Sequence, residues 1–136
     1  IQDAKGWWFK KTDGTWASDG WAYLTWNGQD SWYYFDAEGY LVTGWVLYNG
    51  NWYYMHPIAD GTQGHLYTGW NLIDGQWFYM NPEKGATQGA VLTGWNLINN
   101  IWYYFSEVKD STEGMMLSNT TTPDGYKVGA DGAWIQ

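Results

Sequence analysis

Tryptophan recurs at regular positions along the chain, and its chemistry is the first clue to function. Two series keep a spacing of 25 residues and an earlier pair precedes them: Trp45, Trp70 and Trp95; Trp52, Trp77 and Trp102; and the pair Trp21 and Trp32. An indole ring has an electron-rich face that attracts cations, and each ring contributes about 0.5–2 kcal/mol. Rings brought together from these positions could therefore hold a quaternary ammonium ion.

The same aromatic residues could instead serve as a packed core. Aromatics make up 21% of the chain, and its 13 Trp outnumber its 6 Lys and Arg. Large rings bury much apolar surface, which a protein with few aliphatic residues needs. Leu or Ile would fill a core equally well, so the strict recurrence of Trp favours binding by a subset. Duplication of an ancestral unit would also produce the recurrence, and both interpretations stay open.

Glycine marks the same period and predicts a repeat architecture. Gly14, Gly39, Gly64, Gly89 and Gly114 lie 25 residues apart. A period of about 20–50 residues is typical of solenoids and arrays. We expect one domain built from a partial repeat at 1–19, repeats at about 20–43, 44–68, 69–93 and 94–118, and a C-terminal cap at 119–136.

Each repeat is predicted to be a β-hairpin. The type I′ turn dipeptides are Asn49-Gly50 and Asp74-Gly75, with Asn99-Asn100 and Asn27-Gly28 at matching places. A two-residue turn fixes the register. An isolated hairpin is marginal in water, so the hairpins must stack on one another. The sequence therefore predicts an all-β solenoid of stacked β-hairpins made from repeats of about 20–25 residues.

Register also predicts which side chains share a face. Around Asn49-Gly50, Trp45 pairs with Tyr54 and Leu47 with Trp52. These four residues then share one face, because side chains alternate along a strand. The other face carries Val46, Tyr48, Tyr53 and Met55. In the longer first hairpin, Trp21 pairs with Tyr34 and Tyr23 with Trp32.

This arrangement predicts an aromatic box between two hairpins. Trp45 and Trp52 project together toward the next hairpin, which turns Phe78 and Met80 toward them. Three aromatic walls that converge from two hairpins leave a small box, and such a box suits a quaternary ammonium ion.

Composition excludes several other classes of function. A net charge of −8 repels phosphate, which argues against nucleic-acid binding. There is no cysteine, and the apolar runs are too short for membrane insertion. His56 and His65 share one connector and are expected to be solvated loop histidines, while the carboxylates fit turn chemistry. We expect no catalytic residues, metal ligands or cofactor here, and any catalytic domain should lie outside this chain.

A motif of Gly-Trp, an aromatic run such as Trp-Tyr-Tyr-Phe and then a Gly covers nearly the whole chain. It resembles the cell-wall-binding repeats of choline-binding proteins, which occur in bacterial autolysins, phage lysins and surface proteins. The tail NTTTPDGYKV is similar to the C-terminal close of such surface proteins. The resemblance implies a superhelical stack of hairpins that holds choline groups of teichoic or lipoteichoic acid between successive hairpins. It also implies a secreted module at the cell surface, in which an exposed terminal hairpin could form a homodimer.

The family's ligand positions carry over to four sites in this sequence. Each site combines the Gly-Trp tryptophan and the Trp of the aromatic run with a ring from the next repeat. The expected sites are Trp21, Trp32 and Tyr53; Trp45, Trp52 and Phe78; Trp70, Trp77 and Tyr103; and Trp95 and Trp102 with Tyr126 as the candidate from the cap.

Two alternative functions stay open beside choline binding. Related repeats in glucan-binding domains and clostridial toxins bind carbohydrate, so stacking of sugar rings on the aromatics is one alternative. A structural or adhesive stalk without a ligand is the other, with every aromatic packed. A choline titration separates the three, because a ligand that binds the folded state raises its apparent stability.

Overall fold

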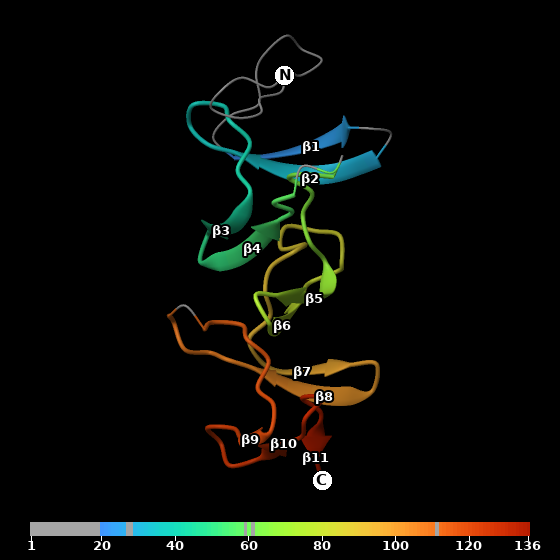
Figure 1. Cartoon of the computed structure of the whole chain (residues 1–136), viewed down its shortest axis with the longest axis vertical. Helices are drawn as coiled ribbons and strands as arrows, with labels where there is room; N and C mark the ends of the chain where they lie inside the picture. Colours follow the sequence, from blue (N-terminus) through green and yellow to red (C-terminus); the bar gives the residue numbers. More distant parts are fainter. Residues whose placement is uncertain (1–19, 27–28, 59, 61, 111) are drawn as a thin grey trace. The chain divides into compact units, whose positions relative to one another are not determined.

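The computed structural model describes residues 20–26, 29–58, 60, 62–110 and 112–136, and the regular secondary structure among them is β-strand. The predicted partial repeat at 1–19 and the Asn27-Gly28 turn lie outside the described residues. The strands are β1 (Gly20–Trp26), β2 (Gln29–Phe35), β3 (Gly44–Tyr48), β4 (Asn51–Met55), β5 (Gly69–Ile73), β6 (Gln76–Met80), β7 (Gly94–Ile98), β8 (Ile101–Phe105), β9 (Thr120–Thr121), β10 (Lys127–Val128) and β11 (Trp134–Ile135) (Figure 1). The predicted all-β class is confirmed.

Four antiparallel hairpins, β1-β2, β3-β4, β5-β6 and β7-β8, contain most of the strand residues of the described chain. Three of their turns have positive φ at both central residues: 49° and 80° at Asn49-Gly50, 51° and 80° at Asp74-Gly75, and 51° and 67° at Asn99-Asn100. This conformation is that of a type I′ turn, whose twist matches that of the flanking strands. The predicted turns are therefore confirmed.

The predicted register and faces are also confirmed. Trp45 pairs with Tyr54 and Leu47 with Trp52. In the longer hairpin Trp21 pairs with Tyr34 and Tyr23 with Trp32. The two faces of β3-β4 differ in burial, since Val46, Tyr53 and Met55 are buried whereas Trp45 and Leu47 are exposed. Because side chains alternate along a strand, the face that carries Trp45 and Leu47 points away from the core of its own repeat.

The connector after each hairpin, expected to be a surface loop, supplies a third short segment that completes the repeat. The connector after each hairpin returns to its second strand and forms an isolated bridge, at Phe35 and Leu41, Met55 and Leu66, Met80 and Val91, and Phe105 and Met116. The hairpin partner in every bridge is at most 2% exposed. The connector therefore covers the hairpin edge and seals the core of its own repeat.

The connectors close through one pattern of backbone hydrogen bonds. In the long connector after β4, the amide of His56 donates to the carbonyl of His65 at 2.9 Å, and Gly64 donates to His56 at 2.7 Å. The connectors after β6 and β8 repeat both bonds, and so does the short one after β2, with Asp36 donating to Tyr40 at 2.9 Å and Gly39 donating to Asp36 at 3.0 Å. Pro57 and Pro82 follow β4 and β6 by two residues, as expected of a residue that cannot donate to a ladder.

Close packing accounts for two members of the glycine series. Gly64 and Gly114 have φ of 89° and 86°, a region that glycine alone adopts readily. A Cβ atom at Gly114 would lie 2.1 Å from Cγ1 of Val91, and one at Gly64 would lie 2.7 Å from Cδ2 of Leu41. The connector backbone therefore approaches the preceding repeat so closely that no side chain fits.

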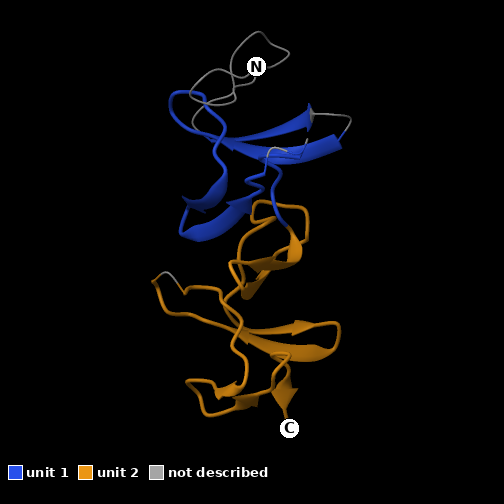
Figure 2. Cartoon of the chain, in the orientation of Figure 1, with its two compact units in different colours: residues 1–67 blue, residues 68–136 orange. Residues whose placement is uncertain are grey.

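The chain divides into two compact units, residues 1–67 and residues 68–136 (Figure 2). In unit 1, Tyr33 and Phe35 of β2 form a buried cluster with Ala22, Leu24 and Leu41 packed against it. Unit 2 contains the hairpins β5-β6 and β7-β8 and a cap in which β10 lies between β9 and β11. Ala133 of the cap forms a bridge with Tyr103 of β8, so the predicted cap closes directly on the last hairpin. Within the described part of the chain, no helix has the length and apolar character needed to cross a membrane.

Candidate aromatic binding sites

The third predicted site lies within unit 2. The ring centroids of Trp70 and Trp77 are 6.2 Å apart and their planes meet at 86°. Tyr103 of the following hairpin comes within 4.9 Å of Trp70 at 75°. Trp77 is 42% exposed although it belongs to this cluster. Rings that meet nearly at right angles can form two walls of a cation site, because an accessible indole face attracts a cation.

The first predicted site lies within unit 1 and differs in detail. Trp21 of β1 contacts Tyr53 of β4 at 4.9 Å, as predicted. Trp32 packs on Tyr23, opposite it in the hairpin, at 5.2 Å. A further ring, Tyr48, reaches Trp21 at 6.0 Å and 86°. Sequence reasoning missed Tyr48 as a site residue, although the predicted face that it shares with Tyr53 was the available signal.

Of the residues predicted for the second site, Trp45 and Trp52 belong to unit 1. Trp45 and Trp52 are 6.2 Å apart at 87°, nearly the same arrangement as Trp70 and Trp77. Tyr54, across the strand pair, lies 4.9 Å from Trp45. Phe78 is a buried residue of unit 2, so its role as the third wall stays a prediction.

The fourth predicted site involves the cap. Tyr126 lies 6.0 Å from Trp95 with an interplanar angle of 85°, so the candidate from the cap does meet the predicted tryptophan. Trp102, the other predicted wall, is 40% exposed and pairs with Leu97 in the ladder. Sequence reasoning assigned Asp124 to turn chemistry alone, but its Oδ2 accepts a hydrogen bond from the indole Nε1 of Trp95 at 2.9 Å.

The hydrogen bonds at Asp124 set its charge state. Its other oxygen accepts from the hydroxyl of Thr122. The Thr122 hydroxyl, followed by the Trp95 indole, lowers the pKa of the Asp124 carboxyl below its usual value. A carboxylate is therefore fixed beside the ring of Trp95.

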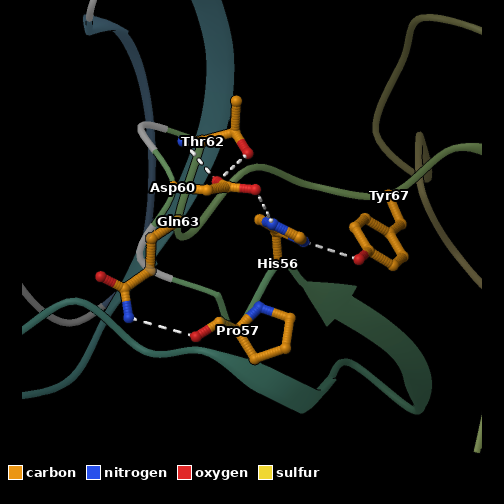
Figure 3. Close-up of polar contacts among 6 residues, drawn as sticks. All are labelled: His56, Pro57, Asp60, Thr62, Gln63 and Tyr67. Atoms are coloured by element: carbon orange, nitrogen blue, oxygen red, sulfur yellow. Dashed lines mark hydrogen bonds and ion pairs between the residues drawn. The ribbon is translucent and has the colours of Figure 1, made fainter.

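Both histidines lie in the connector loop as predicted, but the prediction that they are solvated is wrong, because each is partly buried. His56 is partly buried, and its Nδ1 and Nε2 lie 2.7 Å from the Tyr67 hydroxyl and 3.0 Å from Asp60 (Figure 3). Thr62 donates twice to the same carboxylate, and these bonds, with that from His56, hold the pKa of Asp60 well below its usual range. Burial lowers the pKa of His65, whose Nε2 is buried without a hydrogen-bond partner.

Known metal-binding chemistry has no obvious place in this connector. Among the described residues, no group of three His, Cys, Asp or Glu side chains could hold a metal ion.

The Tyr67 ring of this connector lies 5.0 Å from Tyr54, which itself contacts Trp45. Through Tyr67, the connector thus packs against the aromatic cluster of β3-β4.

Models of known protein families match most of the chain. Two choline-binding repeat families match residues 20–58 and 94–134, and a cell wall binding repeat family matches residues 68–83. The matched ranges contain all four hairpins and most of the cap. The fold and the aromatic clusters define a cell-wall-binding repeat domain.

Solved structures agree with this assignment. The choline-binding domain of Spr1274 from Streptococcus pneumoniae is 32% identical, with a TM-score of 0.53 over 70% of this chain and 96% of that domain. Choline-binding protein F from the same organism, solved in the presence of a peptidoglycan analogue, is 30% identical with a TM-score of 0.64 over 100% of this chain and 46% of its own. The pneumococcal cell wall endolysin of phage Cp-1, complexed with choline, is 33% identical with a TM-score of 0.61 over 100% of this chain and 36% of its own.

The chain belongs to the choline-binding repeat family. It spans about half the length of the choline-binding protein F structures that it matches. No curated protein matches it.

Proposed function

We propose that this chain is a non-catalytic module that binds choline groups of teichoic or lipoteichoic acid at the bacterial cell surface. The observation that carries the proposal is the cluster of Trp70, Trp77 and Tyr103, in which rings from two hairpins meet nearly at right angles. The complex of the phage endolysin with choline supports the same ligand. Any enzymatic activity would then come from a domain outside these residues, and the module would act after secretion.

Several weak sites suit a polymeric ligand better than one strong site. A few cation–π contacts must offset the cost of ordering the ligand, so each site should bind free choline at about millimolar concentration. Teichoic acid carries many choline groups on one chain, and simultaneous binding at several sites raises the overall affinity without new contacts. This gives the repetition of the hairpin a functional reason. Pairing of two chains into a homodimer would add sites in the same way.

The exposed rings distinguish this proposal from a ligand-free stalk. Trp77 and Trp102 are 42% and 40% exposed, whereas a stalk packed by its aromatics would bury them. Exposed indole faces also stack on sugar rings, which keeps carbohydrate binding as the competing function.

One set of titrations separates the three functions. Isothermal calorimetry and Trp fluorescence would follow choline, its neutral isostere 3,3-dimethyl-1-butanol, and a glucan oligosaccharide. We expect saturable binding of choline, a several-fold weaker response to the isostere and none to the glucan, because the rings select positive charge. Binding of the glucan without choline would establish carbohydrate recognition, and silence toward all three would establish a stalk.

A further inference from the structure

We propose that Asp124 makes the cap site, defined as Trp95, Tyr126 and Asp124, selective for cationic over neutral ligands through its negative charge. The inference rests on the proposed choline binding and adds a specificity-determining residue to one site. Its basis is the contact of a carboxylate with an aromatic wall, in which Oδ2 of Asp124 lies 2.9 Å from Nε1 of Trp95.

The cap builds a rigid support for this carboxylate. In the turn from Thr122 to Tyr126, the amide of Gly125 donates to the carbonyl of Thr122 at 2.9 Å, and Thr122 donates to Tyr126 at 2.7 Å. The Thr122 hydroxyl also accepts from the Tyr126 amide at 3.1 Å, and Thr122 is 3% exposed. One buried threonine therefore holds both the backbone at Tyr126 and the carboxylate of Asp124.

The charge of this carboxylate is accessible. Asp124 is exposed to solvent, and the hydroxyl and indole groups that donate to it are both neutral. Its negative charge is also felt by the neighbouring Tyr104 of β8, whose pKa it helps to raise after the larger effects of Glu107 and burial. A cation beside the half-buried Trp95 and the exposed Tyr126 would meet both the ring quadrupoles and this charge.

The third site provides a contrast inside the same unit. Trp70 is surrounded by the neutral rings of Trp77, Tyr79, Tyr103 and Phe105. Binding there should depend on ring faces and change little with salt. Binding at the cap site should weaken as salt rises, since an exposed charge is screened.

The test is a titration by NMR that follows the indole N–H signals of Trp95 and Trp70, assigned with Trp95→Phe and Trp70→Phe. Choline and 3,3-dimethyl-1-butanol would be titrated into the whole chain at low and high salt. The key variant is Asp124→Asn, which keeps an oxygen acceptor for the indole but removes the charge. Asp131→Asn is the matched control, because Asp131 is an exposed carboxylate in the next turn, where it accepts from the amide of Ala133 at 3.0 Å.

We expect Asp124→Asn to raise the choline Kd at Trp95 about fivefold at low salt, as the loss of one exposed charge pair predicts. The Asp124→Asn substitution should leave the choline Kd at Trp70 and the response to the neutral isostere unchanged. The Asp131→Asn protein should keep the original choline Kd at Trp95. An unchanged choline Kd at Trp95, or an equal loss for choline and the isostere, would overturn the role of the charge. A choline response at Trp70 with none at Trp95 would refute this inference alone, whereas no response at either indole would refute the proposed function.

Discussion

Trp70 of β5 and Tyr103 of β8 come from successive hairpins, yet their ring centroids are 4.9 Å apart and their planes meet at 75°. The proposed site that contains them requires both hairpins to be folded and packed together. A ligand at this position would therefore stabilise the packing of one repeat on the next, because binding to the folded state draws the equilibrium toward it.

Removal of the two tryptophans at this site should abolish one binding site. We expect Trp70→Leu combined with Trp77→Leu to lower the choline stoichiometry by one in calorimetry, since Leu fills volume without an aromatic face. Trp70→Phe with Trp77→Phe is the matched control and should retain weaker binding. An unchanged stoichiometry in the leucine protein would show that the site assignment is wrong.

Tyr48 should strengthen the first site. Ile73 and Ile98 occupy the equivalent position in the two following hairpins, so Tyr48→Ile is a substitution that the repeat already accommodates. Loss of one ring at 6.0 Å from Trp21 should weaken choline binding there by a few-fold. The indole N–H signal of Trp21 reports on it, and an unchanged Kd would restrict Tyr48 to packing.

Gly114→Ala should destabilise unit 2. The added Cβ would meet Val91 at 2.1 Å while the residue stays at a φ of 86°, and both effects together should cost about 2–4 kcal/mol. Gly75→Asn is the control, because Gly75 has open space around its Cβ position and Asn100 occupies the equivalent place in the next turn. Denaturant unfolding should show the large loss for the first protein and a change within about 0.5 kcal/mol for the second.

His65 should make the protein less stable in mild acid. Burial lowers its pKa in the folded state below the ordinary 6.5, so the unfolded chain binds a proton that the folded chain resists. Stability is therefore present above pH 6.5 and declines as the pH falls below it. Met115 occupies the equivalent position two repeats later, so His65→Met introduces a residue that the repeat already accommodates. The melting temperature of this protein should fall less than that of the parent between about pH 8 and pH 5. Parallel curves for the two proteins would contradict the prediction.

Tyr104 should titrate late in alkali. Its hydroxyl donates to Glu107 at 2.7 Å, and this bond, with burial, raises the pKa of Tyr104 to about 12 from the ordinary 10.0. The stability that follows is present below pH 10 and is lost as the pH rises toward 12. Glu107→Gln should lower this pKa, as measured by tyrosinate absorbance with Tyr104→Phe as reference. Glu83→Gln, in an exposed connector, should leave it unchanged.

Local physics explains why the hairpins and the contact between Trp70 and Tyr103 were predictable. The dipeptide Asp74-Gly75 fixes the register, and the register fixes which faces Trp70 and Trp77 share. A ring on the opposite face of the next hairpin then becomes the partner, and Tyr103 is that ring. The ligand positions implied by the family resemblance are the same positions that strand alternation predicts.

Tertiary contacts explain what the sequence did not reveal. Asp124 follows Pro123 in a turn, where turn chemistry explains an aspartate, whereas its contact with Trp95 depends on how the cap packs. The connectors lack strand alternation, so their bridges to residues such as Met55 depend on packing rather than on local preference. The bonds of His56 to Asp60 and Tyr67 likewise require a loop that folds back on itself.

The shared closure of the connectors has a consequence for engineering. A short segment between Asp36 and Tyr40 and a longer one between His56 and His65 close with the same backbone bond at 2.9 Å. In both lengths the bonded anchors, together with the glycine that donates to the first anchor, hold the connector to its hairpin. Foreign peptides inserted between these anchors should be displayed without disturbing the repeat, which makes the connectors natural sites for epitope tags and for variation between related bacterial surface proteins.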